Sequence, residues 1–149
     1  MVYADAAYAS KETKRKSVSG GAVMRGGAAI QLISRTQKCT TLSSSEAEYV
    51  AMAKGFKEAL FLRTVWRFLL PVFVNPCIQV LEDNKGATQL AVNPVTNSNS
   101  KHIDVRHNFL REHVENGEFE ISQVQSKYQH ADFLTKPLAK DAFVSTGTL

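Results

Sequence analysis

Three short runs of β-forming residues open the chain and predict three strands. The runs cover Val2 to Tyr8, Val18 to Met24 and Ala28 to Ser34. The tripeptide Arg25-Gly26-Gly27 between the second and third runs is typical of a hairpin turn, because glycine adopts the backbone conformations that tight turns require. We therefore expect a meander of three strands at the start of the domain.

The pattern then changes to helical spacing. Apolar residues recur on one face from Tyr49 to Leu60, and the helical pattern continues without proline to about Leu70. Two overlapping capping boxes, Ser43 to Glu46 and Ser45 to Glu48, mark the start of this helix. A helix of about 25 residues is roughly 37 Å long, and we expect it to be the main helix of the domain.

Strands and helices alternate in the rest of the chain, and polar or proline-containing segments separate them. The patterns predict a strand at Ile78 to Glu82, helices at Asn84 to Val92 and Ile103 to Asn116, a strand at Glu118 to Val124, and a short helix at Ala131 to Leu138. The order β-β-β-α-β-α-α-β-α predicts an α/β fold with one mixed sheet flanked by helices. We expect one domain over residues 1–138 and a frayed C-terminal tail over residues 139–149.

Bulk composition places few limits on function. The chain has 149 residues, 44% hydrophobic and 21% charged, which is typical of one soluble globular domain. Its net charge of +4 permits a polyanionic partner without requiring one. The longest apolar run, Phe68 to Val74, is too short to span a bilayer, so we expect no membrane partner. The strand pattern begins at Val2 with no signal peptide before it, which is typical of a domain cut from a longer polypeptide.

Four acidic residues lie where predicted elements begin or end, and these are Asp5, Glu48, Asp83 and Asp132. Converging carboxylates repel one another strongly unless a cation lies among them, and hard oxygen ligands suit Mg²⁺ or Mn²⁺. Each acid also has a purely structural alternative. Asp5 fits a turn residue, Asp83 fits the N-cap of the next helix, and Asp132 fits a first-turn residue that complements a helix dipole.

Glu46 and Glu48 need separate interpretations, because two residues along a helix differ by about 200° in direction. If Ser43 is the N-cap, Glu46 completes its capping box and Glu48 lies beside the apolar stripe that faces the sheet. Glu48 is then the candidate for chemistry. Its structural alternative is a capping role with Ser45.

Five segments resemble the ribonuclease H domain of copia-type LTR retrotransposon Pol polyproteins, in the same order and at the same spacing. They are Tyr3-Ala4-Asp5-Ala6, Leu42 to Tyr49 with its Ser-Glu-Ala-Glu-Tyr run, Glu82 to Ala87, Ser100 to Arg106 with Lys-His-Ile-Asp, and Gln129 to Lys136. The resemblance implies an RNase H-like fold with a five-stranded mixed sheet flanked by helices. It also implies that the four acids above are the catalytic and metal-binding residues.

The same resemblance implies a function. Such a domain would be a metal-dependent endonuclease that hydrolyses the RNA strand of RNA/DNA hybrids and leaves 5′-phosphate and 3′-hydroxyl ends. Two Mg²⁺ ions, or Mn²⁺ in their place, would be bridged by Asp5. One ion would also be held by Asp132, and the other would be held by Glu48 and Asp83. Reverse transcriptase and integrase modules of the polyprotein would be its partners, with no small-molecule cofactor. Its setting would be intracellular, in cytoplasmic virus-like particles and in the nucleus.

We expect the hybrid to be held mainly through its backbone shape and its 2′-hydroxyl groups. The candidate nucleic-acid-binding residues are Lys14, Arg15, Lys16, Ser45, Asn84, Lys101, His102 and Arg106. The basic cluster around Arg15 has a solvated loop as its alternative, and the segment at Lys101 has a plain helix cap as its alternative.

Two positions depart from the family pattern. A second acid that the family usually carries two residues after the first is Ala7 here, and an aromatic that is usually tryptophan is Tyr8. The alternative function is a catalytically weak or domesticated nucleic-acid-binding module derived from such a domain. A third hypothesis is a structural domain within a larger assembly. Salt-dependent hybrid binding without cleavage would favour the nucleic-acid-binding module. No hybrid binding at all would favour the structural domain.

Overall fold

A five-stranded mixed sheet forms the centre of the protein in a computed structural model that describes residues 1–11, 15–70, 77–93 and 101–147. The strands are β1 (Val2–Lys11), β2 (Lys16–Arg25), β3 (Ala28–Thr36), β4 (Ile78–Glu82) and β5 (Phe119–Gln123). Their order across the sheet is β3-β2-β1-β4-β5. The pairs β1–β2 and β2–β3 are antiparallel, and the pairs β1–β4 and β4–β5 are parallel. The predicted fold class and the N-terminal meander are therefore confirmed.

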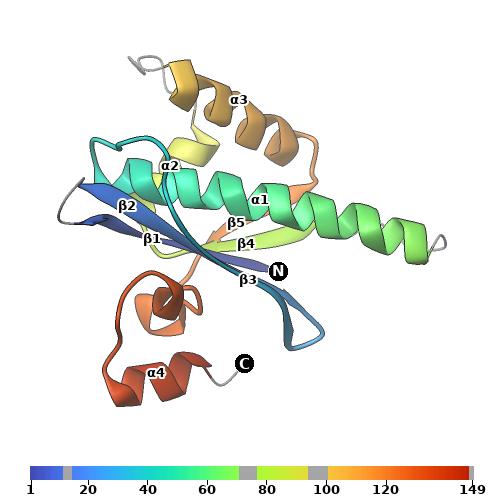
Figure 1. Ribbon diagram of the computed structural model, residues 1–149. Helices are drawn as coiled ribbons and strands as arrows, with labels where there is room; N and C mark the ends of the chain where they lie inside the picture. Colours follow the sequence, from blue (N-terminus) through green and yellow to red (C-terminus); the bar gives the residue numbers. More distant parts are fainter. Residues whose placement is uncertain (12–14, 71–76, 94–100, 148–149) are drawn as a thin grey trace.

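Helices lie on both sides of this sheet. Figure 1 shows α1 (Ser44–Leu69) along one face, with α2 (Lys85–Val92) and α3 (Lys101–Glu115) on the same side. The C-terminal segment lies on the opposite face and contains two 3-10 turns, η1 (Ser126–Tyr128) and η2 (Asp132–Leu134), and a last helix, α4 (Lys140–Gly147). No helix in these described ranges is long and apolar enough to cross a membrane.

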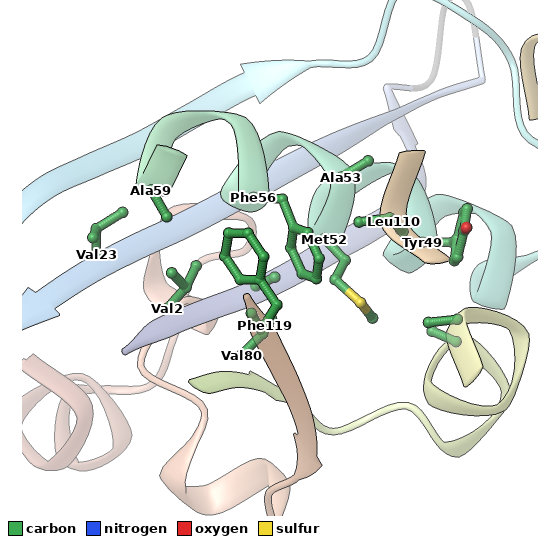
Figure 2. Packing of buried hydrophobic residues seen from close by; sticks show 13 residues of the cluster. Val2, Val23, Tyr49, Met52, Ala53, Phe56, Ala59, Val80, Leu110 and Phe119 are labelled. Carbon is green, nitrogen blue, oxygen red and sulfur yellow. The ribbon is translucent and has the colours of Figure 1, made fainter. Parts of the chain in front are cut away.

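The hydrophobic core lies between α1 and the central strands. The rings of Phe56 on α1 and Phe119 on β5 stack with centroids 3.9 Å apart and planes inclined by 15°. Val2 on β1 and Val80 on β4 are fully buried beside them (Figure 2). Because the same sheet face carries apolar residues from four strands, α1 is held by hydrophobic burial from Ala47 to Ala59.

The C-terminal region differs from the prediction. The helix predicted over Ala131 to Leu138 is reduced to the single 3-10 turn η2, after which Pro137 supplies no backbone N–H to continue a helix. The tail predicted to be frayed contains α4 instead. The ring of Phe143 on this helix contacts the ring of Phe133 in η2, with centroids 6.0 Å apart. The helix therefore gains a tertiary contact that its sequence pattern does not reveal.

Three of the segments that separate the predicted elements lie wholly or partly outside the described residues. They are the polar turn at residues 11–16, of which 12–14 are not described, the proline-rich linker at 71–76, and the polar loop at 95–100.

Phe56→Ala tests whether the core depends on the ring stack. Removing a fully buried phenylalanine side chain leaves a cavity, so we expect the free energy of unfolding to fall by about 3–5 kcal/mol in chemical denaturation. Phe61→Ala on the same helix is the matched control, because Phe61 is 62% exposed and its loss should cost less than about 0.5 kcal/mol. Equal losses in both variants would contradict the described packing.

Candidate metal centre

Three of the four predicted acids meet at one end of the sheet. Asp5 lies within β1, Glu48 lies in the second turn of α1, and Asp83 follows the last residue of β4. Each offers a carboxylate oxygen, and the three oxygens lie within 4.8 Å of one another. Segments far apart in the sequence therefore converge just beyond the paired residues of β1 and β4.

Asp132 is the fourth predicted acid, and it lies beside this group without belonging to the three that converge. It is the first residue of η2 and is nearly buried. Its negative charge helps to raise the pKa of Asp5, so the two side chains share one electrostatic environment. Lys136 Nζ lies 2.9 Å from Asp132 Oδ1 and forms an ion pair with it.

Local capping explains why Glu48 and Asp83 are free to take part. Ser43 is the N-cap of α1 and accepts a hydrogen bond from the Glu46 backbone N–H, and the Glu46 side chain reaches back to the N–H of Leu42. Glu48 therefore has no capping role at this helix end. At the start of α2 the N-cap is Asn84, whose side chain accepts from Ala87 N at 3.0 Å. The structural alternatives for both acids are therefore wrong.

Burial dominates the electrostatics of the group. Burial raises the pKa of Asp5 to about 6, the hydrogen bond from Thr135 and the charge of Lys136 oppose the shift, and nearby carboxylates add to it. Burial also raises the pKa of Glu48 to about 10, and the negative charges of Glu82, Asp5 and Asp83 add to that shift. Carboxyl groups in such surroundings hold their protons unless a cation compensates the charge.

Glu82, the last residue of β4, is a fifth acid in this region and was not among the predicted site residues. It is fully buried, and burial raises its pKa well above the ordinary value, with Asp83 and Asp5 adding to the shift. Its Oε1 accepts a hydrogen bond from the Asn84 backbone N–H at 3.1 Å. Its negative charge also acts on Glu48, so the two side chains share one electrostatic environment.

Two further residues act on the acids and were missed by the sequence analysis. The hydroxyl of Thr135 donates a hydrogen bond to Asp5 Oδ2. Burial alone would lower the pKa of Lys136, but its contact with Asp132 and the charges of Asp5 and Asp83 raise it overall. Both residues follow Asp132 in the motif that carried the family resemblance, and that position was the signal that could have found them.

Unpartnered oxygen atoms indicate that the group suits a cation. Within the described part of the chain, Glu48 Oε2 and Glu82 Oε2 are buried and have no hydrogen-bond partner. A buried carboxylate oxygen without a partner is costly, and a hard divalent cation would compensate that cost. The donor set, which consists of carboxylate oxygens alone, is the one that Mg²⁺ and Mn²⁺ prefer.

The predicted nucleic-acid-binding residues have different surroundings. Arg15 and Lys16 lie at the β1–β2 turn, at the same end of the sheet as the acids. Arg15 is exposed, and Lys16 Nζ donates a hydrogen bond to Lys38 O at 3.0 Å. Ser45 Oγ donates to Asn84 Oδ1 at 3.3 Å, so these two polar groups link α1 to α2.

Arg106 is half-buried, and its guanidinium lies 3.7 Å from Cys39 Sγ. Lys14 lies outside the described residues, and the described structure covers only the backbone of Lys101 and His102 at the start of α3.

A cavity of about 490 Å³ lies elsewhere, and none of the acids lines it. Its walls come from the second half of α1, the β2–β3 hairpin and the starts of β1 and β4, and they include Val23, Leu62, Trp66 and Ile78. This cavity is therefore separate from the acidic group.

Comparison with known proteins gives two kinds of match. No family model matches the chain. The chain is 34% identical over 142 residues to the retrovirus-related Pol polyprotein from transposon TNT 1-94 of Nicotiana tabacum, which covers 95% of this chain. It is 36% identical over 141 residues to the retrovirus-related Pol polyprotein from transposon RE1 of Arabidopsis thaliana. The chain spans about a tenth of the length of these curated relatives.

Solved structures with the same fold are ribonucleases H. RNase H1 from Halobacterium salinarum NRC-1 aligns with a TM-score of 0.60 at 17% identity, over 90% of this chain and 91% of that one. LC11-RNase H1 in complex with an RNA/DNA hybrid aligns with a TM-score of 0.63 at 13% identity, over 90% of this chain and 91% of that one. The fold expected from the sequence resemblance is therefore confirmed.

Raising the pH should destabilise the protein when divalent cations are removed. Above about pH 4 the folded state holds protons on Asp5 and Glu48 that the unfolded chain releases, so the free energy of unfolding falls as pH rises. The stabilisation from the proton on Asp5 is lost between the ordinary pKa of 3.8 and about pH 6. The stabilisation from the proton on Glu48 is lost more gradually, up to about pH 10. One unit of pKa difference corresponds to about 1.4 kcal/mol.

Thermal unfolding in EDTA at pH 5 and pH 8 measures this slope, and Glu48→Gln is the control that removes the contribution of Glu48. A melting temperature that is independent of pH in the parent would contradict the described burial of these carboxyl groups.

Gly20→Ala tests how closely the C-terminal segment approaches the sheet beneath Asp5. Gly20 pairs with Asp5 across β1 and β2, and a Cβ at Gly20 would lie 2.6 Å from Thr135 Cγ2 and 2.9 Å from Ala131 O. We expect a loss of about 1–3 kcal/mol in the free energy of unfolding, because the backbone at Ala131 cannot move aside freely. Gly21→Ala is the control, since the nearest atom to its Cβ would be the flexible end of Ile33 at 3.3 Å, with Tyr3 O at an ordinary 3.7 Å, and it should cost less.

Proposed function

The chain belongs with the retrovirus-related Pol polyproteins of plant transposons as a domain of the ribonuclease H fold, and from this premise we propose that it is a metal-dependent endonuclease that cuts the RNA strand of RNA/DNA hybrids. The observation that carries the proposal is the convergence of Asp5, Glu48 and Asp83 at one end of the sheet, with buried carboxylate oxygens that lack partners. An acidic group of this kind has no evident structural purpose without a cation.

Asp5, Glu48 and Asp83 are the proposed ligands, and Asp132 completes the set. Two Mg²⁺ ions, for which Mn²⁺ could substitute, would activate a water and stabilise the leaving oxygen of the phosphodiester when bound. The expected products carry 5′-phosphate and 3′-hydroxyl ends. Thr135 fixes one oxygen of Asp5 by its hydrogen bond, so the carboxylate is oriented before any cation arrives.

Recognition of the hybrid would use the basic groups around the acidic end of the sheet. Arg15 and Lys16 lie at the β1–β2 turn and supply positive charge at this end. LC11-RNase H1 has been solved with an RNA/DNA hybrid, and its fold matches that of this chain, which supports hybrid as the ligand to test. Reverse transcriptase and integrase modules are proposed as covalent neighbours, because the curated relatives are Pol polyproteins about ten times longer.

Cleavage of an end-labelled RNA strand in an RNA/DNA hybrid, with Mg²⁺ or Mn²⁺, tests this function. We expect the parent to cut the hybrid and to leave a DNA duplex intact. Asp5→Asn and Asp83→Asn should lower the rate constant by more than about 100-fold, because each removes a direct ligand and not merely an outer partner.

Glu46→Gln is the matched control, since Glu46 serves the start of α1 and not the acidic group. Equal rates in Asp5→Asn and the parent would refute the proposed carboxylate site. Hybrid binding by a folded parent with no cleavage would support the weak nucleic-acid-binding module in place of the nuclease.

A further inference from the structure

Gln129 is a buried polar residue whose side chain lies beneath the acidic group. It is fully buried and follows η1 in the C-terminal segment, three residues before Asp132. The sequence motif that contains Gln129 carried the family resemblance, but the proposed function gives this residue no role. A buried amide that only filled space would be costly, so its hydrogen bonds show what it does.

The side-chain amide of Gln129 bridges two neighbouring strands. Its Nε2 donates to Ala4 O on β1 at 2.8 Å and to Leu81 O on β4 at 3.3 Å. Its Oε1 accepts from the Ala131 backbone N–H at 3.3 Å. This orientation of the amide places both hydrogens on carbonyl oxygens and the oxygen on an N–H.

The bridge lies where the direct pairing of these strands ends. The register of β1 and β4 includes Val2 with Val80 and Tyr3 with Leu81, and Gln129 takes the next carbonyl of β1. Asp5 follows Ala4 directly, and Asp83 comes two residues after Leu81. One side chain therefore ties the two strands together at the last point before each delivers its carboxylate.

The same residue also anchors the fourth acid. The backbone N–H of Asp132 donates to Gln129 O at 3.2 Å, which fixes the turn that begins η2. Side chain and backbone of Gln129 thus connect the segments that carry Asp5, Asp83 and Asp132. Carboxylates repel one another, so a tie between their backbones is needed to keep them close.

We propose that Gln129 is a positioning residue that sets the separation of the carboxylates and thereby the cation affinity of the site, an inference that rests on the proposed function. Because Gln129 is fully buried and is no carboxylate, it would act through the ligands without touching substrate or cation. Loss of an outer hydrogen-bond partner typically lowers metal affinity or activity by about 10–100-fold. We expect a loss of that size when the amide is removed.

Gln129→Met in the whole chain tests this, because methionine matches glutamine in length and has no donor. We expect Mn²⁺ affinity, measured by calorimetry, to fall about 10–100-fold, and kcat for hybrid cleavage to fall with KM little changed. Phe119→Leu is the stability-matched control, since Phe119 lies in the core at the opposite end of β5 from the acids and its variant should keep the parental Mn²⁺ affinity. Gln129→Asn, which keeps the amide but is too short to reach both carbonyls, replaces Gln129→Met if that variant does not fold.

Hydrogen exchange without metal gives a second, independent readout. Peptides that cover residues 2–8 and 80–86 should exchange faster in Gln129→Met than in Phe119→Leu at equal global stability. Parental Mn²⁺ affinity and control-like exchange in Gln129→Met would overturn the inference. If the parent binds Mn²⁺ but does not cut hybrid, the proposed function is overturned and the role of Gln129 is not. If the parent binds no Mn²⁺, the hydrogen-exchange comparison decides whether Gln129 ties the two strands together.

Discussion

Repulsion among buried carboxyl groups is the constraint on which the arrangement of this protein depends. Oxygens of Asp5, Glu48 and Asp83 lie within 4.8 Å of one another, and Glu82, which is fully buried, adds a fourth acid beside them. In water such groups would move apart. A rigid framework is therefore needed to hold them together when no cation lies among them. The parallel pairing of β1 with β4 and the docking of α1 supply that framework, because each carries one of the three acids or leads directly into it.

The two faces of the sheet make different kinds of contact. On one face, α1 contributes apolar contacts that account for most of the burial, including the Phe56–Phe119 stack. On the other face, the C-terminal segment contributes polar contacts to the acids themselves, through Gln129, Thr135 and Lys136. The apolar packing and the polar contacts that orient Asp5 and Asp132 therefore come from different segments.

Most of the fold could be predicted because its signals are local. Proline, glycine and capping residues mark the element ends, and β4 begins and ends where the apolar pattern places it, from Ile78 to Glu82. The contacts that organise the site join distant residues, and no local pattern reveals them. Gln129 and its partner Ala4 are 125 positions apart, and Thr135 and Asp5 are 130 apart. Local sequence could therefore suggest which acids matter but not what holds them.

The acidic group also changes how the net charge of the chain should be interpreted. Five of the 14 acidic residues gather in this region, and these are Asp5, Glu48, Glu82, Asp83 and Asp132. The remaining nine acids are outnumbered by the 18 lysines and arginines of the chain. Burial raises the pKa of Asp5 and of Glu48, which further lowers the negative charge of the metal-free protein. The rest of the molecule is therefore more basic than a net charge of +4 suggests. For the proposed nuclease, a charge distribution of that kind would attract a polyanion, and a bound cation would offset the repulsion between the polyanion and the clustered carboxylates.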